Sequence, residues 1–409
     1  MTGPKQFHNP EEIVSSSPGL RVTRYPGSCA LPFATPTGLC PRSSSQPQPL
    51  RGDVGRLIPR VARSSQPWAL RRNPFGIQGS IFWMRLAFAC VFINSIARAE
   101  AVPTGPGIKH AHIAGRECVR LADWGKAQGL EMRWIKRDES FEFRGNGKRL
   151  SFTTNSREIE IAGVRLWLLF PLVAQNGDIY IAQQDVQTTI QPVLTPSRNS
   201  RGAKINTICL DPGHGGKDPG ERAAGNVEKQ YTLLLAEELR GQLTRAGLKT
   251  VLTRTTDTFI ELPTRPELAK RRGADLFVSL HFNSIDTSRD SVKGAEVYCL
   301  TPSGAPSTNA QGEGGGGWCI GNRDNDRNML LAYEIQKALG QIQAVEDRGV
   351  RRARFAVLRD ATMPAVLVEG GFMSHPIEGR KILTPGYRRQ LARAIAEGVL
   401  SYKKIVERG

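Results

Sequence analysis

The chain has 409 residues and a formal net charge of +18 at pH 7, and 39% of its residues are hydrophobic. This length is enough for two domains with tails rather than a single core. The basic balance fits an anionic polymer partner or simple solubility, and nucleic acid is the weaker interpretation because no RNA- or DNA-binding motif accompanies the charge.

Residues 1–83 are rich in proline and serine and show no sustained hydrophobic period. They hold 12 of the 26 prolines, together with 10 Lys or Arg and only 3 Asp or Glu. Such a segment cannot bury enough apolar surface to offset the entropy that ordering costs. We therefore expect 1–83 to be disordered.

Residues 84–99 have the pattern of a secretory signal peptide. One positive charge precedes an apolar run, Leu86–Ile96, and a small-x-small site follows just before Glu100. The run is shorter than the roughly 20 residues that span a bilayer, so no transmembrane anchor is expected. Because signal peptides begin chains, the pattern favours translation from Met84 and makes 1–83 an over-extended gene start, with a genuine extension as the alternative. Export to the periplasm or cell envelope is expected.

Four cysteines remain after the signal-like segment: Cys118, Cys209, Cys299 and Cys319. They show no CxxC spacing, which argues against a cysteine zinc site. Cys299 and Cys319 flank a glycine-rich loop, and the sequence leaves open whether they pair in an oxidising compartment.

Residues 117–195 are predicted to form a small β-rich domain with one early helix, within Val119–Leu130. Short alternating stretches follow, separated by turn dipeptides, at 132–135, 140–144, 149–153, 158–161, 164–169 and 179–181. The segment resembles the copper-amine-oxidase-like N-terminal (stalk) domains of bacterial envelope proteins. The resemblance carries no copper chemistry and implies a wall-binding or spacing module.

From residue 204 onward, strand-like and helix-like stretches alternate. Strands are predicted at 205–210, 249–254, 275–281, 295–300, 354–359 and 364–369, and helices at 228–246, 264–273, 326–343 and 387–404. Leu235, Leu239 and Leu243 recur at four-residue spacing and are the expected buried stripe of the first helix. The alternation predicts an α/β fold, with a doubly wound, mostly parallel sheet and helices on both faces.

Two histidines and two glutamates lie where predicted regular structure meets a loop. His214 lies in the turn Asp211-Pro-Gly-His-Gly-Gly216, Glu228 begins a helix, and His281 and Glu369 end apolar strands. Open α/β sheets build sites at the carboxyl ends of strands, and a helix start keeps a carboxylate ionised. Each residue alone has a structural explanation, such as a turn histidine or a first-turn helix charge. Together, in this order, they predict a hydrolytic zinc site.

Four ordered motifs between about 204 and 404 resemble the zinc-dependent N-acetylmuramoyl-L-alanine amidase family 3 catalytic domain. They are Asp211-Pro-Gly-His-Gly-Gly216, Glu228-Lys229, Ser279-Leu-His-Phe-Asn283 and Val368-Glu-Gly-Gly-Phe-Met-Ser374. The resemblance implies that His214, Glu228 and His281 bind Zn²⁺, with water in the fourth place. It also implies that Glu369 moves a proton from the attacking water to the departing amine.

The implied substrate is peptidoglycan, cut at the amide between the lactyl group of N-acetylmuramic acid and L-alanine. Two alternatives stay open: a zinc carboxypeptidase or peptidase acting on stem peptides, and a non-catalytic wall-binding regulator. No activator protein is identified by the sequence.

Other residues near the motifs have less specific roles. His375 is expected at the rim of the site and not as a ligand. Turn, pocket or supporting roles stay open for Asp211, Asp218 and Asn283. The segment Thr301–Arg323 is too rich in glycine to hold a stable helix, so a mobile rim loop is expected instead of a self-inhibitory helical insert.

Overall fold

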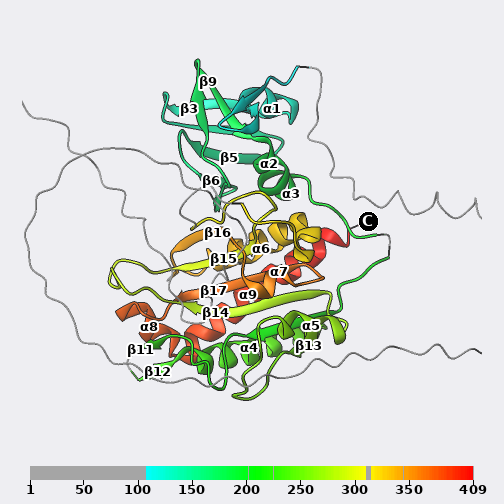
Figure 1. Ribbon diagram of the computed structural model, residues 1–409, viewed down its shortest axis with the longest axis vertical. Helices are drawn as coiled ribbons and strands as arrows, with labels where there is room; N and C mark the ends of the chain where they lie inside the picture. The colour runs from blue at the N-terminus through cyan, green and yellow to red at the C-terminus, as the bar shows by residue number, and fades with distance from the viewer. Residues whose placement is uncertain (1–106, 201, 224, 310–314, 344, 409) are drawn as a thin grey trace, which may run out of the picture. The chain divides into compact units, whose positions relative to one another are not determined.

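The computed structural model describes residues 107–408, apart from 201, 224, 310–314 and 344 (Figure 1). The predicted extension, 1–83, and the predicted signal peptide, 84–99, lie outside this described part. Within it, an N-terminal region of short strands precedes a region in which strands and helices alternate.

Short antiparallel strands joined by tight turns make up the N-terminal region. Its elements are β1 (His110–Ile113), β2 (Arg116–Arg120), α1 (Leu121–Ala127), β3 (Glu131–Lys136), β4 (Ser140–Gly145), β5 (Lys148–Thr153), β6 (Glu158–Ile161), β7 (Val164–Trp167), β8 (Val173–Gln175), β9 (Asp178–Ala182), α2 (Gln183–Asp185), a π-helical turn η1 (Val186–Ile190) and α3 (Gln191–Leu194). Asn146-Gly147 and Asn176-Gly177 have positive φ at both residues and connect β4 to β5 and β8 to β9. Asn-Gly pairs favour this two-residue hairpin turn, because its geometry matches the strand twist.

The second region contains β10 (Thr207–Pro212), β11 (Arg222–Ala223), β12 (Asn226–Val227), α4 (Glu228–Arg245), β13 (Lys249–Leu252), α5 (Thr264–Arg271), β14 (Leu276–Asn283), β15 (Ala295–Leu300), a 3₁₀ turn η2 (Ile320–Asp324), α6 (Asn325–Leu339), β16 (Asp347–Ala353), α7 (Ala356–Arg359), β17 (Ala365–Phe372), α8 (Pro376–Ile382) and α9 (Pro385–Val406). The predicted leucine stripe of α4 is confirmed, since Leu235, Leu239 and Leu243 are all buried.

One sheet of 11 strands runs through both regions in the order β13–β10–β14–β17–β15–β16–β7–β6–β5–β4–β3. β13, β10, β14 and β17 are parallel, β15 is antiparallel to β17, and β16 is parallel to both β15 and β7. The predicted α/β class with a mostly parallel central sheet is therefore confirmed. The carboxyl ends of β10, β14 and β17 consequently meet at one edge.

Alternate residues of the central strands enter two different apolar cores. Leu210 of β10 and Val368 of β17 belong to a core that includes α4, α6 and α9. Their neighbours Cys209 and Leu367 belong to a second core that includes residues of α5 and α7. Strands covered on both faces become apolar on both faces, which explains why these segments read as continuous apolar runs. Helices cover both faces, as predicted.

The N-terminal region shares its core with the second region. β7 pairs with β16 in parallel, with Leu166 opposite Val350. Both side chains are buried in the same apolar core. The Tyr333 hydroxyl on α6 donates a hydrogen bond to the carbonyl of Ile161 at 3.2 Å. The two regions are therefore joined by a continuous β-sheet and by side chains that pack in the same core.

The predicted strand at 354–359 is wrong. The sheet position belongs to Asp347–Ala353, and the helical turn Ala356–Arg359 follows it. Periodicity misses β16 because several of its residues are charged: Asp347, Arg348, Arg351 and Arg352. Pairing with β7 and β15, which involves distant parts of the chain, places these charges in the sheet. The sequence patterns also do not predict β1, β2 or α8.

The glycine-rich segment after β15 is held by hydrogen bonds at its described ends. Arg354 donates to the carbonyls of Pro302 at 2.6 Å, Gly316 at 3.0 Å and Gly317 at 3.1 Å. Because β15 runs antiparallel to β17, the segment leaves the sheet at the end opposite to Glu369. The expected rim position is therefore wrong for these described ends, whereas the mobility of the segment stays a prediction.

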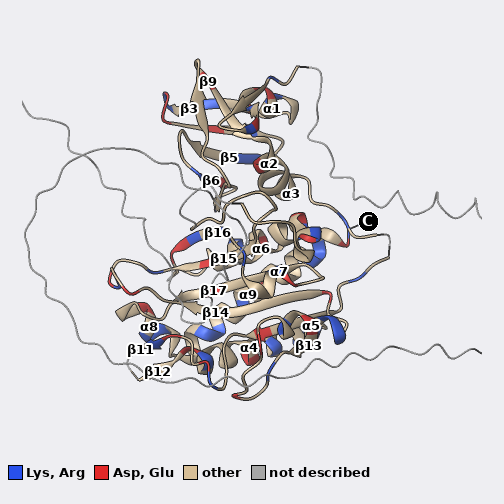
Figure 2. Cartoon of the chain, viewed as in Figure 1, with Lys and Arg blue, Asp and Glu red and all other residues tan. Residues whose placement is uncertain are grey.

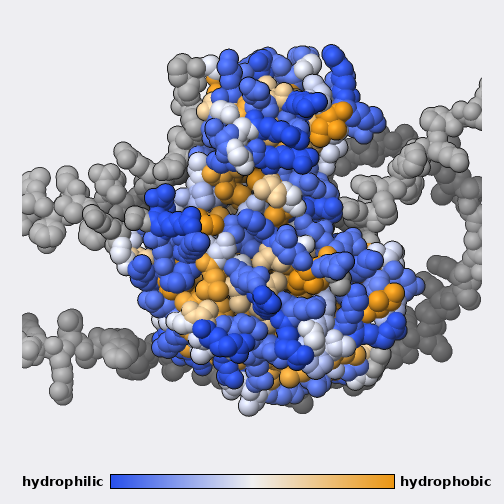
Figure 3. Space-filling view, turned by 180° about the vertical axis from the view of Figure 1, so that it is seen from behind, coloured by the Kyte–Doolittle hydropathy of each residue, from blue (hydrophilic) through white to orange (hydrophobic). Residues whose placement is uncertain are grey.

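Apolar residues on the face seen in Figure 3 form separate patches among hydrophilic ones. The large apolar side chains that are most exposed are single residues on different elements or loops: Ile135, Trp318 and Ile377. Scattered exposure of this kind is normal for a folded chain. No helix among the described residues is both long enough and apolar enough to cross a membrane.

Asp185, at the end of α2, is a fully buried carboxyl group. It accepts hydrogen bonds from the backbone N–H of Leu169 at 2.7 Å and of Phe170 at 3.1 Å, and from the Thr189 hydroxyl at 3.2 Å. Burial, only partly opposed by these bonds, raises the pKa of Asp185 from 3.8 to about 6. The folded state therefore holds this proton more tightly than the unfolded chain. The stabilisation is complete below about pH 4 and is lost as the pH rises through about 6.

We expect Asp185→Asn to remove this pH dependence. Between about pH 4 and about pH 7, the free energy of unfolding of the wild type should fall relative to the variant by on the order of 3 kcal/mol. Urea unfolding of both proteins at the two pH values measures the change. The exposed Asp138→Asn is the control and should leave the pH dependence intact. An Asp185→Asn protein that follows the wild-type pH profile would contradict the assignment.

Candidate functional site

The four predicted site residues lie at one edge of the sheet. His281 of β14 pairs directly with Glu369 of β17. His214 follows β10 by two residues, and Glu228 is the first residue of α4. Pro212 at the end of β10 pairs with Leu280, the residue before His281. Parallel strand order therefore brings together residues that are far apart in the chain.

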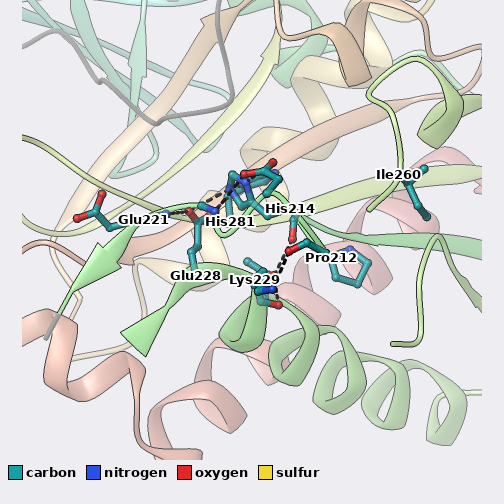
Figure 4. Close-up of polar contacts among 12 residues, drawn as sticks. Pro212, His214, Glu221, Glu228, Lys229, Ile260 and His281 are labelled. Carbon is teal, nitrogen blue, oxygen red and sulfur yellow. Dashed lines mark hydrogen bonds and ion pairs between the residues drawn. The ribbon is translucent and has the colours of Figure 1, made fainter. Parts of the chain in front are cut away.

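His214, Glu228 and His281 form a compact buried cluster (Figure 4). One ligand atom from each lies within 4.8 Å of the other two. The Glu228 carboxylate lies between the two imidazoles, with Oε2 at 3.0 Å from His214 Nε2 and Oε1 at 3.1 Å from His281 Nδ1. Two nitrogens and a carboxylate at this separation could hold one metal ion.

Charge within the cluster is balanced internally. Burial alone would raise the pKa of Glu228, but the neighbouring His214 and His281 hold it well below its usual range. Burial would lower the pKa of His214, but the charge of Glu228 and the hydrogen bond to Asp218 raise it to about 10. Burial lowers the pKa of His281. The pocket thus favours one positive charge beside an ionised carboxylate.

The orientation of His214 fits a metal ligand. Its Nδ1 lies 2.9 Å from Asp218 Oδ2, which leaves Nε2 directed into the cluster. Nε2 is buried and, although it is close to Glu228, it is not aligned for a hydrogen bond with any described residue. In metal sites, a carboxylate commonly hydrogen-bonds the far nitrogen of a ligating imidazole and so fixes the orientation of the ring. The residues present therefore fit a divalent metal that accepts nitrogen and oxygen ligands.

The turn that carries His214 has an unusual backbone. His214 itself has φ of +61°, in the left-handed region that side chains disfavour. Two buried arginines hold this turn: Arg254 donates to the carbonyls of Pro212 at 3.1 Å and Gly213 at 2.8 Å, and Arg265 donates to those of Pro212 at 3.0 Å and His214 at 2.8 Å. These bonds fix three successive carbonyls and so keep the strained conformation in place.

Asp211 anchors this arrangement from inside the sheet. Its Oδ1 accepts from Arg265 at 2.9 Å and from the Thr253 hydroxyl at 2.6 Å, and its Oδ2 accepts from the Ser279 hydroxyl at 2.8 Å. Asp211 is fully buried, and an unpaired carboxylate there would be costly. Its role is to hold Arg265 under the turn.

Glu369 is a buried carboxyl group of a different kind. Its Oε2 has no hydrogen-bond partner among the described residues. Burial, reinforced by the charges of Glu228 and Glu296, raises the pKa of Glu369 well above its usual range. A carboxyl group with one unpartnered oxygen and an increased affinity for a proton is suited to proton transfer.

Two further residues near the motifs do not line the cluster. His375 caps α8, accepting from the backbone N–H of Ile377 and Glu378 at 3.1 Å, and lies 3.1 Å from the Asp290 carbonyl through Nε2. Asn283 Nδ2 donates to Glu296 Oε1 at 2.7 Å. The prediction that His375 is not a ligand agrees with this cap, and Asn283 supports a second buried carboxylate.

Sequence patterns miss that second carboxylate, Glu296, and the buried Glu221. Both lie near the cluster: Glu296 pairs across the strands with Glu369, and the Glu221 N–H donates to Glu228 Oε2 at 3.0 Å. Neither has a neighbouring motif of its own. The only available signal is an acidic residue inside an otherwise apolar strand, Ala295–Leu300.

All four described cysteines are free, and Cys299 is buried whereas Cys319 is partly exposed. The pairing that the sequence leaves open is therefore not formed in this structure.

Gly213→Ala is expected to disrupt the cluster. A Cβ at this position would lie 2.2 Å from His281 Cε1 and 2.5 Å from its Nε2, so the imidazole must move. We expect the affinity for a divalent metal to fall by at least about tenfold, measured by competition with a chelator of known affinity. Gly241→Ala on α4, whose Cβ would meet only Arg245 at 3.5 Å, is the control. Unchanged metal affinity in a folded Gly213→Ala protein would show that the imidazole position does not matter.

Comparison with known proteins places this geometry in a family. Residues 208–401 match the family profile described as N-acetylmuramoyl-L-alanine amidase. The N-acetylmuramoyl-L-alanine amidase AmiA of Escherichia coli (strain K12) is 32% identical over 279 residues, which are 62% of this chain and 94% of AmiA. AmiC of Neisseria meningitidis serogroup B is 34% identical over 239 residues, which are 52% of this chain and 57% of AmiC.

Among solved structures, AmiC2 of Nostoc punctiforme is 35% identical, with a TM-score of 0.42, over 50% of this chain and 99% of that one. The amidase of Clostridium difficile 630 is 32% identical, with a TM-score of 0.42, over 51% of this chain and 100% of that one. Because the match at 32% identity takes in 94% of AmiA and the family profile matches the segment that holds all four site residues, the chain belongs to the N-acetylmuramoyl-L-alanine amidase family.

Proposed function

We propose that this amidase binds Zn²⁺ through His214, Glu228 and His281 and uses Glu369 to transfer protons during peptidoglycan hydrolysis. The observation that carries the proposal is the buried cluster of three ligand atoms within 4.8 Å of one another, with Glu369 paired across the strands from His281. The bond cut is the amide between the lactyl group of N-acetylmuramic acid and L-alanine.

The ligand set supports zinc over the other common metals. Two imidazoles with one carboxylate are a familiar catalytic zinc set that leaves a position open for water or substrate. The neighbouring histidines hold the pKa of Glu228 below its usual range, and both of its oxygens face a histidine. When bound, zinc polarises the scissile carbonyl and makes water more acidic.

Glu369 supplies the proton transfers. Its Oε2, which has no described hydrogen-bond partner, takes a proton from the attacking water as the water oxygen joins the carbonyl carbon. The carbon–nitrogen bond then breaks, and the same proton passes to the nitrogen of L-alanine. Once Glu369 has taken the proton, its raised pKa helps it to hold the proton until the carbon–nitrogen bond breaks.

The remaining parts of the chain have supporting roles in this proposal. Residues 204–404 form the catalytic domain, and residues 117–195 form the β-rich domain that positions it on the cell wall. Export follows from the segment 84–99, with hydrolysis taking place in the periplasm or cell envelope.

Glu369→Gln is expected to lower kcat by about 10² to 10⁴-fold, the usual contribution of a positioned acid–base group. Metal affinity should stay at the wild-type value, because Glu369 is not among the three ligands. The measurement is chromatography of purified muropeptides after digestion, with metal content determined in parallel. Glu237→Gln, an exposed residue of α4, should behave as wild type.

The product identities separate the alternatives. Stem peptides that begin with free L-alanine support the amidase assignment, whereas loss of terminal D-alanine indicates a peptidase. Wild-type digestion by Glu369→Gln would remove the assigned proton-transfer role, and a metal-free wild-type protein with full activity would remove zinc.

Export makes a separate prediction. Mass spectrometry of the protein from the cell envelope should find Glu100 as the first residue, because signal peptidases cut after a small-x-small site. A peptide from residues 1–83 in that sample would reject both the cleavage and the start at Met84.

A further inference from the structure

Three of the buried residues at the site form a row across neighbouring strands. His281 on β14 pairs with Glu369 on β17, and Glu369 pairs with Glu296 on β15. Residues that are directly opposite across strands project from the same face of the sheet, with their Cβ atoms about 5 Å apart. Glu369 is therefore confined between a proposed metal ligand and a second buried carboxylate.

Glu296 is held by three hydrogen bonds, from Arg348, Asn283 and Tyr298, and by an ion pair with Arg351. Its Oε2 lies 2.9 Å from Arg348 Nε and 2.8 Å from Arg351 Nε, and its Oε1 accepts from Asn283 Nδ2 at 2.7 Å and from the Tyr298 hydroxyl at 2.8 Å. Glu369 has no such set, since its Oε2 lacks a partner among the described residues. The Glu296 carboxylate is therefore fixed in place, whereas the neighbouring Glu369 carboxylate is available for chemistry.

The two arginines come from β16, the strand that pairs with the N-terminal region. Figure 2 shows charged residues of both signs on this strand. Trp167, the last residue of β7, contacts both arginines. Its ring centroid lies 4.4 Å from the Arg351 guanidinium, and its Nε1 donates to the Arg348 carbonyl at 3.2 Å. A guanidinium over an indole ring is attracted to it and loses rotational freedom.

A continuous series of contacts therefore joins the N-terminal region to the site. Trp167 contacts Arg348 and Arg351, both arginines contact Glu296, and Glu296 lies opposite Glu369. The members after Trp167 lie on three adjacent strands of the sheet, β16, β15 and β17. Without the indole, Arg351 would be free to move away from Glu296. The Glu296 side chain would then change its orientation relative to Glu369.

We propose that Trp167 is a positioning residue for the reaction, and that the N-terminal β-rich region is a structural part of the active site as well as a wall-positioning module. This inference rests on the proposed function, because it takes Glu369 as the group that transfers the proton. Trp167 acts only through Arg348, Arg351 and Glu296 and does not touch the substrate.

The first test replaces Trp167 in the full-length chain. Trp167→Ala should lower kcat on soluble muropeptides about fivefold, with KM and zinc content unchanged, because geometry at the reacting centre is lost while binding is kept. Trp167→Phe retains a ring for Arg351 and should recover most of kcat. Trp134→Ala is the matched control: Trp134 lies on β3, packs on Phe141, and should leave kcat at the wild-type value.

The second test asks whether Trp167 acts through Glu296. Glu296→Gln should lower kcat by itself, and adding Trp167→Ala should lower it little further, since the two changes break the same series of contacts. The proposal would be overturned if the two losses in kcat were additive, or if Trp167→Ala kept the wild-type kcat. It would also be overturned if the loss in kcat only followed the folded fraction of the protein, measured by thermal unfolding.

The Glu369→Gln variant distinguishes failure of the positioning role of Trp167 from failure of the proton-transfer role of Glu369. If Glu369→Gln is inactive and Trp167→Ala is unaffected, the positioning role fails and the proposed function stands. If Glu369→Gln retains wild-type activity, the proton-transfer role of Glu369 fails, and the positioning role of Trp167, which rests on it, fails with it.

Discussion

One buried carboxylate, that of Glu228, sets the requirements for the rest of the site. Its two oxygens face His214 and His281, and they also accept the backbone N–H of Glu221 and of Phe282, each at 3.0 Å. A charge that is only 1% exposed is stable only if every lone pair has a partner. The sheet edge, the helix start and the glycine turn must therefore converge on this group.

The turn after β10 carries the strain that this convergence requires. His214 occupies a left-handed backbone conformation. Gly213 leaves room for the His281 ring, because a Cβ at this position would clash with that ring. Strained residues persist at functional sites when the surroundings over-determine them. Arg254 and Arg265, with Asp211 behind them, provide that constraint through the turn carbonyls. The geometry of the His214, Glu228 and His281 cluster is thus a property of the whole sheet edge and not of the glycine motif alone.

The same sheet links this edge to the N-terminal region. β7 extends the sheet beyond β16, so that Trp167 lies beside two arginines that also contact Glu296. The two regions share one apolar core, and a change in one can reach the other through packed side chains.

The local pattern of the sequence determined the α/β alternation, the leucine stripe of α4 and the candidate roles of His214, Glu228, His281 and Glu369, because apolar periodicity and glycine turns are properties of neighbouring residues. It did not determine that the charged segment Asp347–Ala353 is a strand and that 354–359 is not, since that choice depends on pairing with β15 and β7. Nor did it indicate Glu296, which becomes significant only when β15 turns antiparallel and faces Glu369. Only the tertiary structure decided those placements, because they follow from contacts between strands that are distant in the chain.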